Sequence, residues 1–536
     1  MRKLISKNIF IGATILALAG IFSRAIGAFY KIPLTNTLGA NGMGVYYLVF
    51  PLYSLLLVLC SSGVATAVST IIAKERAKNN RKNELIIFRI SLIYSAILSI
   101  ISAIVLVVFA DKISLLQGNI NAKLGYFAIA PALIFASIIS VVRAFFQSMQ
   151  NMFPTSISYI IEQIVKVVFG LYFAKRFLEY GIEYSVFGAV LGVSISEFVS
   201  LIMLMINYLH YRKKNNYVYI DTNMPELTYS YLEAFKIVFK YSLPATLSSI
   251  IIPITSFLDS FMVINILVGS GFTSAVATTL YGLNNGIVAS LVNLPIIFIS
   301  ALSTAFMPNL SSNISELDKD VVNKKCSMFV KMTFLISLPF VVFIIIYAKD
   351  IVYLLYSRGL DSRVINEFEF VYKLLIVSSG SIIYYGFLQT FTAILQAISK
   401  PVQPLISLSV SLLIRFVLVV ILVNIPSLNI FGVVLANTVF LIVACLISLM
   451  YIKRSVELKF SLYRMFVVPI FSIFVSSMFC LLSRELLVDT HIYIYAVFTA
   501  IVGGILYIAL LFILKCFSVE ERNMLPKFIK KKKKLV

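Results

Sequence analysis

The sequence predicts an all-α polytopic membrane protein with about fourteen transmembrane helices. Of its 536 residues, 60% are hydrophobic and only 13% are charged, whereas soluble domains carry roughly a quarter charged residues. The apolar residues form runs of about 20 residues or more, the length that crosses a bilayer as a helix. The loops between these runs are short and leave no room for a soluble catalytic domain.

The apolar runs place the individual spans. The seventh and eighth runs are longer than a crossing requires and contain Pro244, Pro253 and Pro295, so we expect them to kink or to begin as interfacial segments. The predicted spans lie near residues 8–30, 43–73, 86–110, 123–147, 157–178, 185–209, 236–268, 275–308, 328–348, 368–396, 403–424, 430–452, 464–484 and 493–515.

The net charge of +22 predicts an orientation in the membrane. In a soluble protein such a charge would suggest nucleic acid as a partner, but here the basic residues form short clusters between apolar runs. With both termini in the cytoplasm, about 27 of the 45 Lys and Arg residues fall in cytoplasmic segments and about 10 in outside segments. We therefore expect a multi-pass cell-membrane protein with both termini cytoplasmic and no nucleic-acid partner. The polybasic run Lys530–Lys534 is expected to contact anionic lipid.

Metal, cofactor and catalytic motifs are not found in the sequence. The five cysteines are scattered through or beside apolar runs without a CxxC motif, and there are only two histidines. No paired acidic residues face a cytoplasmic loop, as a membrane glycosyltransferase would require. We expect no metal, no cofactor and no enzymatic activity.

A weak internal repeat suggests how the spans are grouped. The segments 145–158 and 393–407 each join two predicted spans, and a shift of 249 residues superposes Gln147 on Gln396, Ser158 on Ser407 and Lys166 on Arg415. The two segments are six spans apart, so both copies face the same way across the membrane, as in a parallel repeat. We expect a six-helix lobe over 1–235, a second over 236–460, and two additional helices with the polybasic tail over 461–536.

Ionisable residues inside predicted spans are the candidate site residues. Such groups cost several kcal/mol in the bilayer and usually face the bundle interior or a wet cavity. The candidates are Arg24, Arg143, Glu162, Lys166, Glu197, Asp259 and Arg415.

Their spacing suggests different roles. Glu162 and Lys166 are four residues apart with the acid first, so they share a helix face and can pair, either to neutralise each other or within a binding site. Neither Arg24 nor Arg415 has an acid one turn away, so each needs a partner on another helix or a ligand. Arg143 lies near the end of its span, where we expect it to snorkel to the interface.

The acidic candidates and the arginines suggest two kinds of ligand. Glu197 and Asp259 are expected to be counter-ions to the buried cations or cation-coupling sites. Arginine suits an anionic ligand because its planar fork binds a diphosphate bidentately and stays charged when buried. An inside-negative potential would favour outward passage of such an anion by about 2.3 kcal/mol per charge per 100 mV.

Several segments resemble a known family. They are SRAIGAFYKIPL (23–34), GANGMGVYYLVFPLYSLL (39–56), SSGVATAVSTIIAK (61–74), FFQSMQNMFPTSISYIIEQIVKV (145–167) and YGIEYSVFGAVLG (180–192). Together they resemble the stage V sporulation protein B family, in the polysaccharide transporter branch of the multidrug/oligosaccharidyl-lipid/polysaccharide exporters and related to the MurJ lipid II flippases. The resemblance implies two six-helix lobes plus two terminal helices. It also implies export of an undecaprenyl-diphosphate saccharide, such as lipid II for peptidoglycan or spore cortex.

The resemblance also implies site residues. The context Ser23-Arg24-Ala25-Ile26-Gly27 matches the family's cavity-lining arginine of the first helix, which identifies Arg24. A second family arginine would fall on Tyr30, with Lys31 one step later. Family arginines of the second and eighth helices have no counterpart in 43–73 or 275–308, and the additional helices, 464–515, would form a groove for the lipid tail. The expected substrate-binding residues are Arg24, Lys31, Lys166 and Arg415, with Glu162, Glu197 and Asp259 as charge-pairing or coupling residues.

Two other functions fit parts of the same pattern. A cation-coupled multidrug exporter of the same superfamily would use Asp259, Glu162 or Glu197 as coupling acids. A non-transporting scaffold would instead recruit cortex-synthesis enzymes, with Lys530–Lys534 as its contact. The expected partners are a lipid-linked saccharide, membrane lipids and cell-wall synthesis enzymes, and we expect a monomer.

Overall fold

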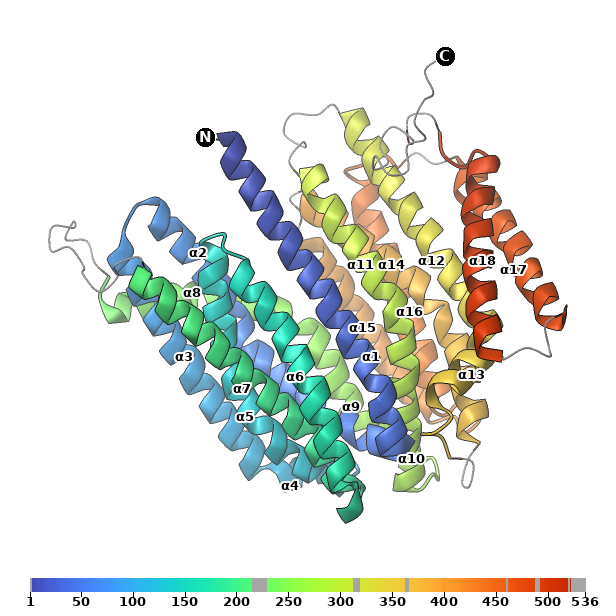
Figure 1. The fold of residues 1–536 in the computed structure, drawn as a ribbon, viewed down its shortest axis with the longest axis horizontal. Helices are drawn as coiled ribbons and strands as arrows, with labels where there is room; N and C mark the ends of the chain where they lie inside the picture. Colours follow the sequence, from blue (N-terminus) through green and yellow to red (C-terminus); the bar gives the residue numbers. More distant parts are fainter. Residues whose placement is uncertain are drawn as a thin grey trace. The chain divides into compact units, whose positions relative to one another are not determined.

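The structure, a computed structural model, describes residues 2–214, 229–311, 319–361, 366–398, 400, 402–458, 461–486, 492–518 and 521. Every regular element in these ranges is a helix (Figure 1). Within the described residues, thirteen helical stretches are long and apolar enough to cross a membrane, and the first of them, Thr14–Ala77, covers the second predicted span and most of the first. The predicted class, a polytopic all-α membrane protein, is confirmed. The predicted polybasic contact, Lys530–Lys534, lies outside the described residues.

The chain forms two compact units. Unit 1 comprises residues 1–290, 358–364 and 419–433, and unit 2 comprises 291–357, 365–418 and 434–536. The helices within 1–290 are α1 (Arg2–Leu57), η1 (Val58–Ser62), α2 (Gly63–Ala77), α3 (Arg81–Val108), α4 (Ala110–Leu116), η2 (Ile120–Ala122), α5 (Lys123–Ser148), α6 (Phe153–Phe177), η3 (Leu178–Tyr180), α7 (Ile182–Lys214), α8 (Tyr231–Ser249), α9 (Ile251–Gly269), α10 (Ser274–Gly282) and η4 (Leu283–Val288). The later helices are α11 (Ala289–Ser311), α12 (Lys319–Tyr356), α13 (Glu367–Ser379), α14 (Ser381–Ala397), α15 (Val402–Val423), α16 (Phe431–Lys453), η5 (Tyr463–Val467), α17 (Val468–Leu486) and α18 (Ile492–Ile513).

A single glycine lets α1 provide two crossings. At 1.5 Å per residue, 56 straight helical residues would extend about 84 Å, far more than a bilayer is thick. The helix breaks at Gly39, whose φ of 69° and ψ of 177° are readily adopted only by glycine. The break falls between the first and second predicted spans, and the second span, 43–73, begins in the second arm of α1 and continues through η1 into α2.

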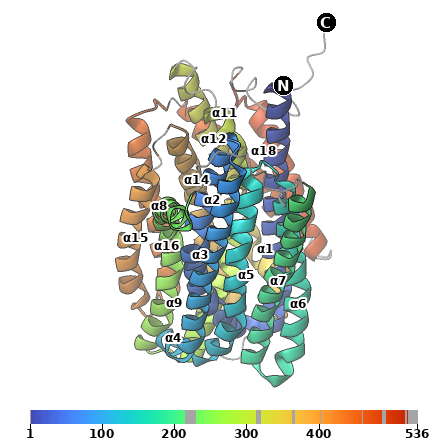
Figure 2. The ribbon, with the colours of Figure 1, turned by 90° about the vertical axis from the view of Figure 1, so that its left-hand side faces the viewer.

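The seventh predicted span is interrupted, as its length suggested, whereas the eighth is continuous and contains only a local π-helical turn. The seventh divides at Ile250 into α8 and α9, and only α9 is apolar and long enough to be a candidate crossing. Helix α8 begins with a capping box, in which the Ser230 backbone N–H donates to Glu233 Oε2 at 2.8 Å. In Figure 2 α8 is seen nearly end-on, so it runs across the neighbouring helices of unit 1. The eighth contains the π-helical turn η4 between α10 and α11.

Unit 2 contains a buried cation that we did not identify from the sequence. The side chain of Lys331, on α12, is only 5% exposed. Its Nζ donates to the Cys516 carbonyl at 2.8 Å and contacts Glu521 Oε2 at 2.9 Å. The ammonium also lies 5.2 Å from the centre of the Phe517 ring. These contacts attach the segment that follows α18 to the middle of the chain.

Candidate functional site

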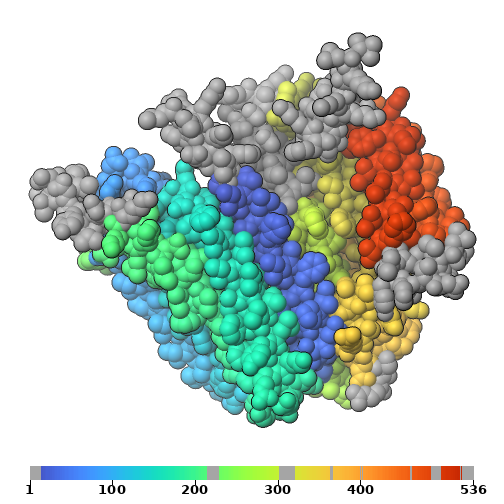
Figure 3. All heavy atoms as spheres, in the orientation of Figure 1, coloured from blue at the N-terminus to red at the C-terminus, as the bar shows by residue number. Residues whose placement is uncertain are grey.

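The candidate site lies within unit 1, where α6 and α7 pack closely and α1 runs beside them (Figure 3). The approach of α6 and α7 depends on two glycines, because a Cβ on Gly192 would lie 2.4 Å from the Cα of Gly170. This packing brings Glu162 and Lys166 of α6 near Glu197 of α7, and each acts electrostatically on the others. Three of the predicted candidates are therefore in one charged cluster.

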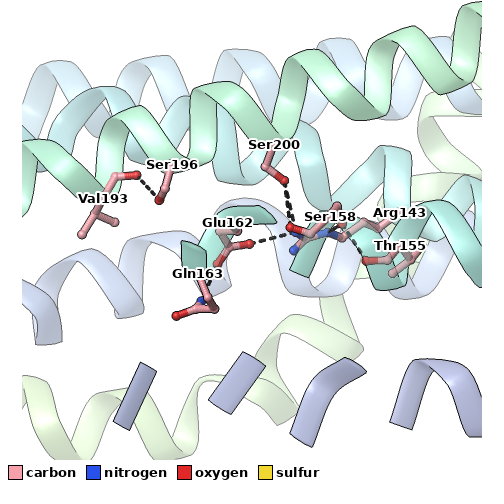
Figure 4. Close-up of polar contacts among 8 residues, drawn as sticks. All are labelled: Arg143, Thr155, Ser158, Glu162, Gln163, Val193, Ser196 and Ser200. Carbon is pink, nitrogen blue, oxygen red and sulfur yellow. Dashed lines mark hydrogen bonds and ion pairs between the residues drawn. The ribbon is translucent and has the colours of Figure 1, made fainter. Parts of the chain in front are cut away.

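Arg143 of α5 binds the Glu162 side of this cluster (Figure 4). Its Nη2 lies 2.8 Å from Glu162 Oε2, and its Nε donates to Ser158 Oγ at 2.8 Å. The guanidinium stacks on the Tyr159 ring, with Cζ 4.1 Å from the ring centre. A weaker contact of 3.5 Å joins Nη2 to Ser200 Oγ on α7. Arg143 thus links three helices of unit 1.

This geometry corrects two expectations. Arg143 does not snorkel, because its side chain is only 12% exposed and is held by the ion pair and the Tyr159 ring. The pair expected between Glu162 and Lys166 is not formed, because the Glu162 carboxylate binds Arg143 instead. Within the described ranges Lys166 has neither an ion pair nor a hydrogen bond through its ammonium. Arg143 and Lys166 compete for the Glu162 carboxylate, and the sequence pattern alone could not show which of them binds it.

The first arm of α1 packs against α6. Arg24, Gly27 and Lys31 have the spacing of one helix face. A Cβ on Gly27 would lie 3.0 Å from Gln163 Oε1 and 4.0 Å from Lys166 Nζ, so this face lies directly against Gln163 and Lys166. Glycine at this position lets α1 approach the α6 side chains. The sequence analysis did not identify Gln163, although it adjoins Glu162.

Lys31 joins the same cluster through the second arm of α1. Its Nζ lies 5.2 Å from the centre of the Tyr47 ring, a cation–π contact. The charges of Lys31 and Lys166 act on each other, yet in the part of the chain that the structure describes neither ammonium, nor the Arg24 guanidinium, has an ion pair. The site therefore contains two ammonium groups, Lys31 and Lys166, whose charge is not balanced by direct contacts within the described residues.

The acidic residues only partly compensate these charges. Glu197 is 8% exposed and makes no hydrogen bond or ion pair within the described ranges. The three basic residues Lys31, Arg143 and Lys166 outnumber Glu162 and Glu197. Arg24, which shares the helical spacing of Lys31, is an exposed further cation on α1. Such a cluster favours an anion that exchanges its hydration shell for these groups.

Two predicted site residues lie elsewhere. Asp259 is half-buried on α9 and is not among the charged groups acting on Lys166 or Glu197. Arg415 belongs to α15 in unit 2, where it is 5% exposed and has interactions of its own. No group of His, Cys, Asp and Glu in the described ranges could hold a metal ion.

The fold, together with the relatives described next, defines a class: a polytopic α-helical membrane transporter of the flippase and exporter type. The chain belongs to the polysaccharide biosynthesis protein family, whose sequence profile matches residues 9–314, more than half of the chain. A second profile, that of the MatE family, matches residues 244–421. The resemblance found in the sequence is confirmed by these matches and by the relatives that follow.

The chain is similar to two Bacillus subtilis (strain 168) proteins over most of its length. It is 25% identical to stage V sporulation protein B, covering 87% of this chain and 88% of that protein. It is 23% identical to lipid II flippase MurJ, covering 84% of this chain and 83% of that protein. The solved structure of lipid II flippase MurJ in an inward closed conformation shares the fold, with a TM-score of 0.70 and 17% identity over 94% of this chain and 99% of that one.

Proposed function

We propose that the protein moves an undecaprenyl-diphosphate-linked saccharide across the cell membrane by alternating access, for peptidoglycan or spore cortex synthesis. The observation that carries this proposal is the pair of ammonium groups Lys31 and Lys166 of unit 1, which act on each other and have no ion pair within the described residues. Burying such charges without a counter-ion is costly. A diphosphate diester carries one negative charge on each phosphate and can pair with both groups, and the spacing of Arg24 puts a further cation on the same face of α1.

Several features of this proposal extend beyond unit 1. Two same-facing six-helix lobes, 1–235 and 236–460, would rock against each other, and both termini would face the cytoplasm. Arg415 would contribute a further cation from the second lobe. The two additional helices of 461–536 would accommodate the lipid tail. The protein would act as a monomer on a lipid-linked saccharide, among membrane lipids and beside cell-wall synthesis enzymes.

Flipping of labelled lipid II in proteoliposomes tests the proposal. Lys166→Gln and Arg24→Ala should each lower the initial rate about 10-fold or more, because each removes a charge-assisted contact to phosphate. Lys175→Gln is the matched control, since it makes the same change at an exposed position of the same helix and should flip at the wild-type rate. If folded wild-type protein flips no lipid II, the proposed substrate is wrong. If Lys166→Gln flips lipid II at the wild-type rate, the proposed binding site is wrong.

The match to the MatE family favours a cation-coupled drug exporter as the second candidate. Such an exporter would use Glu197, Glu162 or Asp259 to bind the coupling ion. Glu197→Gln and Asp259→Asn would then abolish proton- or sodium-driven efflux of a cationic dye from proteoliposomes. Our proposal predicts instead no dye efflux by the wild-type protein under either ion gradient.

A further inference from the structure

We propose that Arg143 is a positioning residue for the substrate: it holds the Glu162 carboxylate away from Lys166 and so keeps the Lys166 ammonium free for phosphate. This inference rests on the proposed function and specifies how the site stays competent to bind an anion. Arg143 itself need not touch the substrate, since it acts through Glu162.

The argument begins with a competition within α6. A glutamate four residues before a lysine is the favoured orientation for an ion pair along a helix. Glu162 and Lys166 have this spacing, and in a bilayer, where other partners are scarce, such a pair would be expected to form. If it formed, the Lys166 charge would be neutralised before a substrate arrived.

Arg143 prevents this pair by binding Glu162 from α5. The Nη2–Oε2 distance of 2.8 Å is that of a strong charge-assisted hydrogen bond. The second carboxylate oxygen, Oε1, accepts a hydrogen bond from Gln163 Nε2 at 3.2 Å. Both oxygens of Glu162 therefore have partners other than Lys166 (Figure 4).

Additional contacts hold Arg143 in position. Ser158 Oγ accepts a hydrogen bond from Arg143 Nε, and the Ser158 hydroxyl itself donates to the Thr155 carbonyl at 2.7 Å. The Tyr159 ring stacks on the guanidinium, and Nη2 also contacts Ser200 Oγ of α7 at 3.5 Å. A flexible lysine could not reproduce this planar arrangement. The geometry is fixed by packing, so the Glu162 carboxylate stays with Arg143.

The other charged groups around Lys166 fit this account. Lys31 acts on Lys166 as a like charge, which favours an anion between them. Glu197 is the remaining acid that acts on Lys166, but it makes no ion pair within the described residues. Only the Glu162 carboxylate is in the favoured spacing to capture Lys166, and only that carboxylate is held by Arg143.

Equilibrium binding of fluorescent lipid II to the full-length protein in nanodiscs tests the inference. Glu162→Gln should bind at least as tightly as wild type, because Lys166 is already free of Glu162 in the wild type and the change removes a negative charge beside the site. A merely structural ion pair predicts weaker binding, since breaking it would loosen the site. Weaker binding by folded Glu162→Gln overturns the inference.

The complementary variants locate the effect at Lys166. Arg143→Gln should bind about 10-fold more weakly, because the released Glu162 carboxylate then neutralises Lys166, and adding Glu162→Gln to it should restore binding. In the wild-type background Lys166→Gln should weaken binding on its own. An Arg143→Gln defect that Glu162→Gln does not relieve would overturn the inference, whereas a wild type that binds no lipid II would instead overturn the proposed function. Thermal unfolding of each variant confirms folding, and Glu162→Gln alone suffices if Arg143→Gln does not fold.

Discussion

Gly282→Ala is expected to destabilise the protein by about 3 kcal/mol or more, because it places a methyl group where α1 and α10 cross in unit 1. A Cβ at Gly282 would lie 2.0 Å from the Ala40 carbonyl oxygen and 2.5 Å from the Gly44 nitrogen. Both are backbone atoms, so no side chain can rotate away and one of the helices must move. The temperature of half-unfolding in detergent should fall by several degrees.

Helix α1, the other partner in this crossing, provides the control. Gly20 is helical and has no atom within 4 Å of an added Cβ, so Gly20→Ala should be neutral or stabilising by about 0.5–1 kcal/mol, the difference in helix propensity. Gly44→Ala should resemble Gly282→Ala, since its Cβ would lie 2.1 Å from the Thr278 carbonyl oxygen. If Gly282→Ala unfolds at the same temperature as Gly20→Ala, the crossing is not as close as the structure shows.

Glu521→Ala is expected to have the second large effect, about 3–5 kcal/mol, because it leaves the buried Lys331 ammonium without its counter-ion. The reverse change, Lys331→Met, should cost less. The Glu521 side chain that it leaves unpaired is 24% exposed and can be hydrated, whereas Lys331 is buried. The double variant Lys331→Met/Glu521→Ala should be more stable than Glu521→Ala alone. The measurement is the order of the unfolding temperatures of these three variants.

An exposed pair in the same unit is the control. On α13, Lys373 Nζ lies 2.6 Å from Glu369 Oε1, but the side chains of Glu369 and Lys373 are 46% and 55% exposed. Removing either should change stability by less than about 1 kcal/mol, because water already solvates both groups. Equal effects of Glu521→Ala and Glu369→Ala would show that the Lys331 contact does not hold the segment after α18.

The membrane class and most span positions could be predicted because they depend on local composition. A run of about 20 apolar residues has no stable place in water, and the bilayer requires its backbone to be helical. The division at Ile250 falls within the overlong seventh span, where length and proline content indicated a kink, and the break at Gly39 falls in the gap between the first two predicted spans. The candidate residues Arg24, Lys166, Glu162 and Glu197 were found for a related reason: a charge inside an apolar run is costly and marks a special site.

The sequence alone therefore determined the fold class, the spans and the set of charges that must be accommodated within them. The tertiary structure decided which charges pair. Glu162 has Lys166 four residues away on its own helix, but packing of α5 against α6 brings Arg143 to 2.8 Å and releases Lys166. Lys331 likewise acquires Glu521, 190 residues later, only through folding of the chain end onto α12. Pairing of buried charges depends on interhelical distances of a few ångströms, which local sequence patterns do not contain.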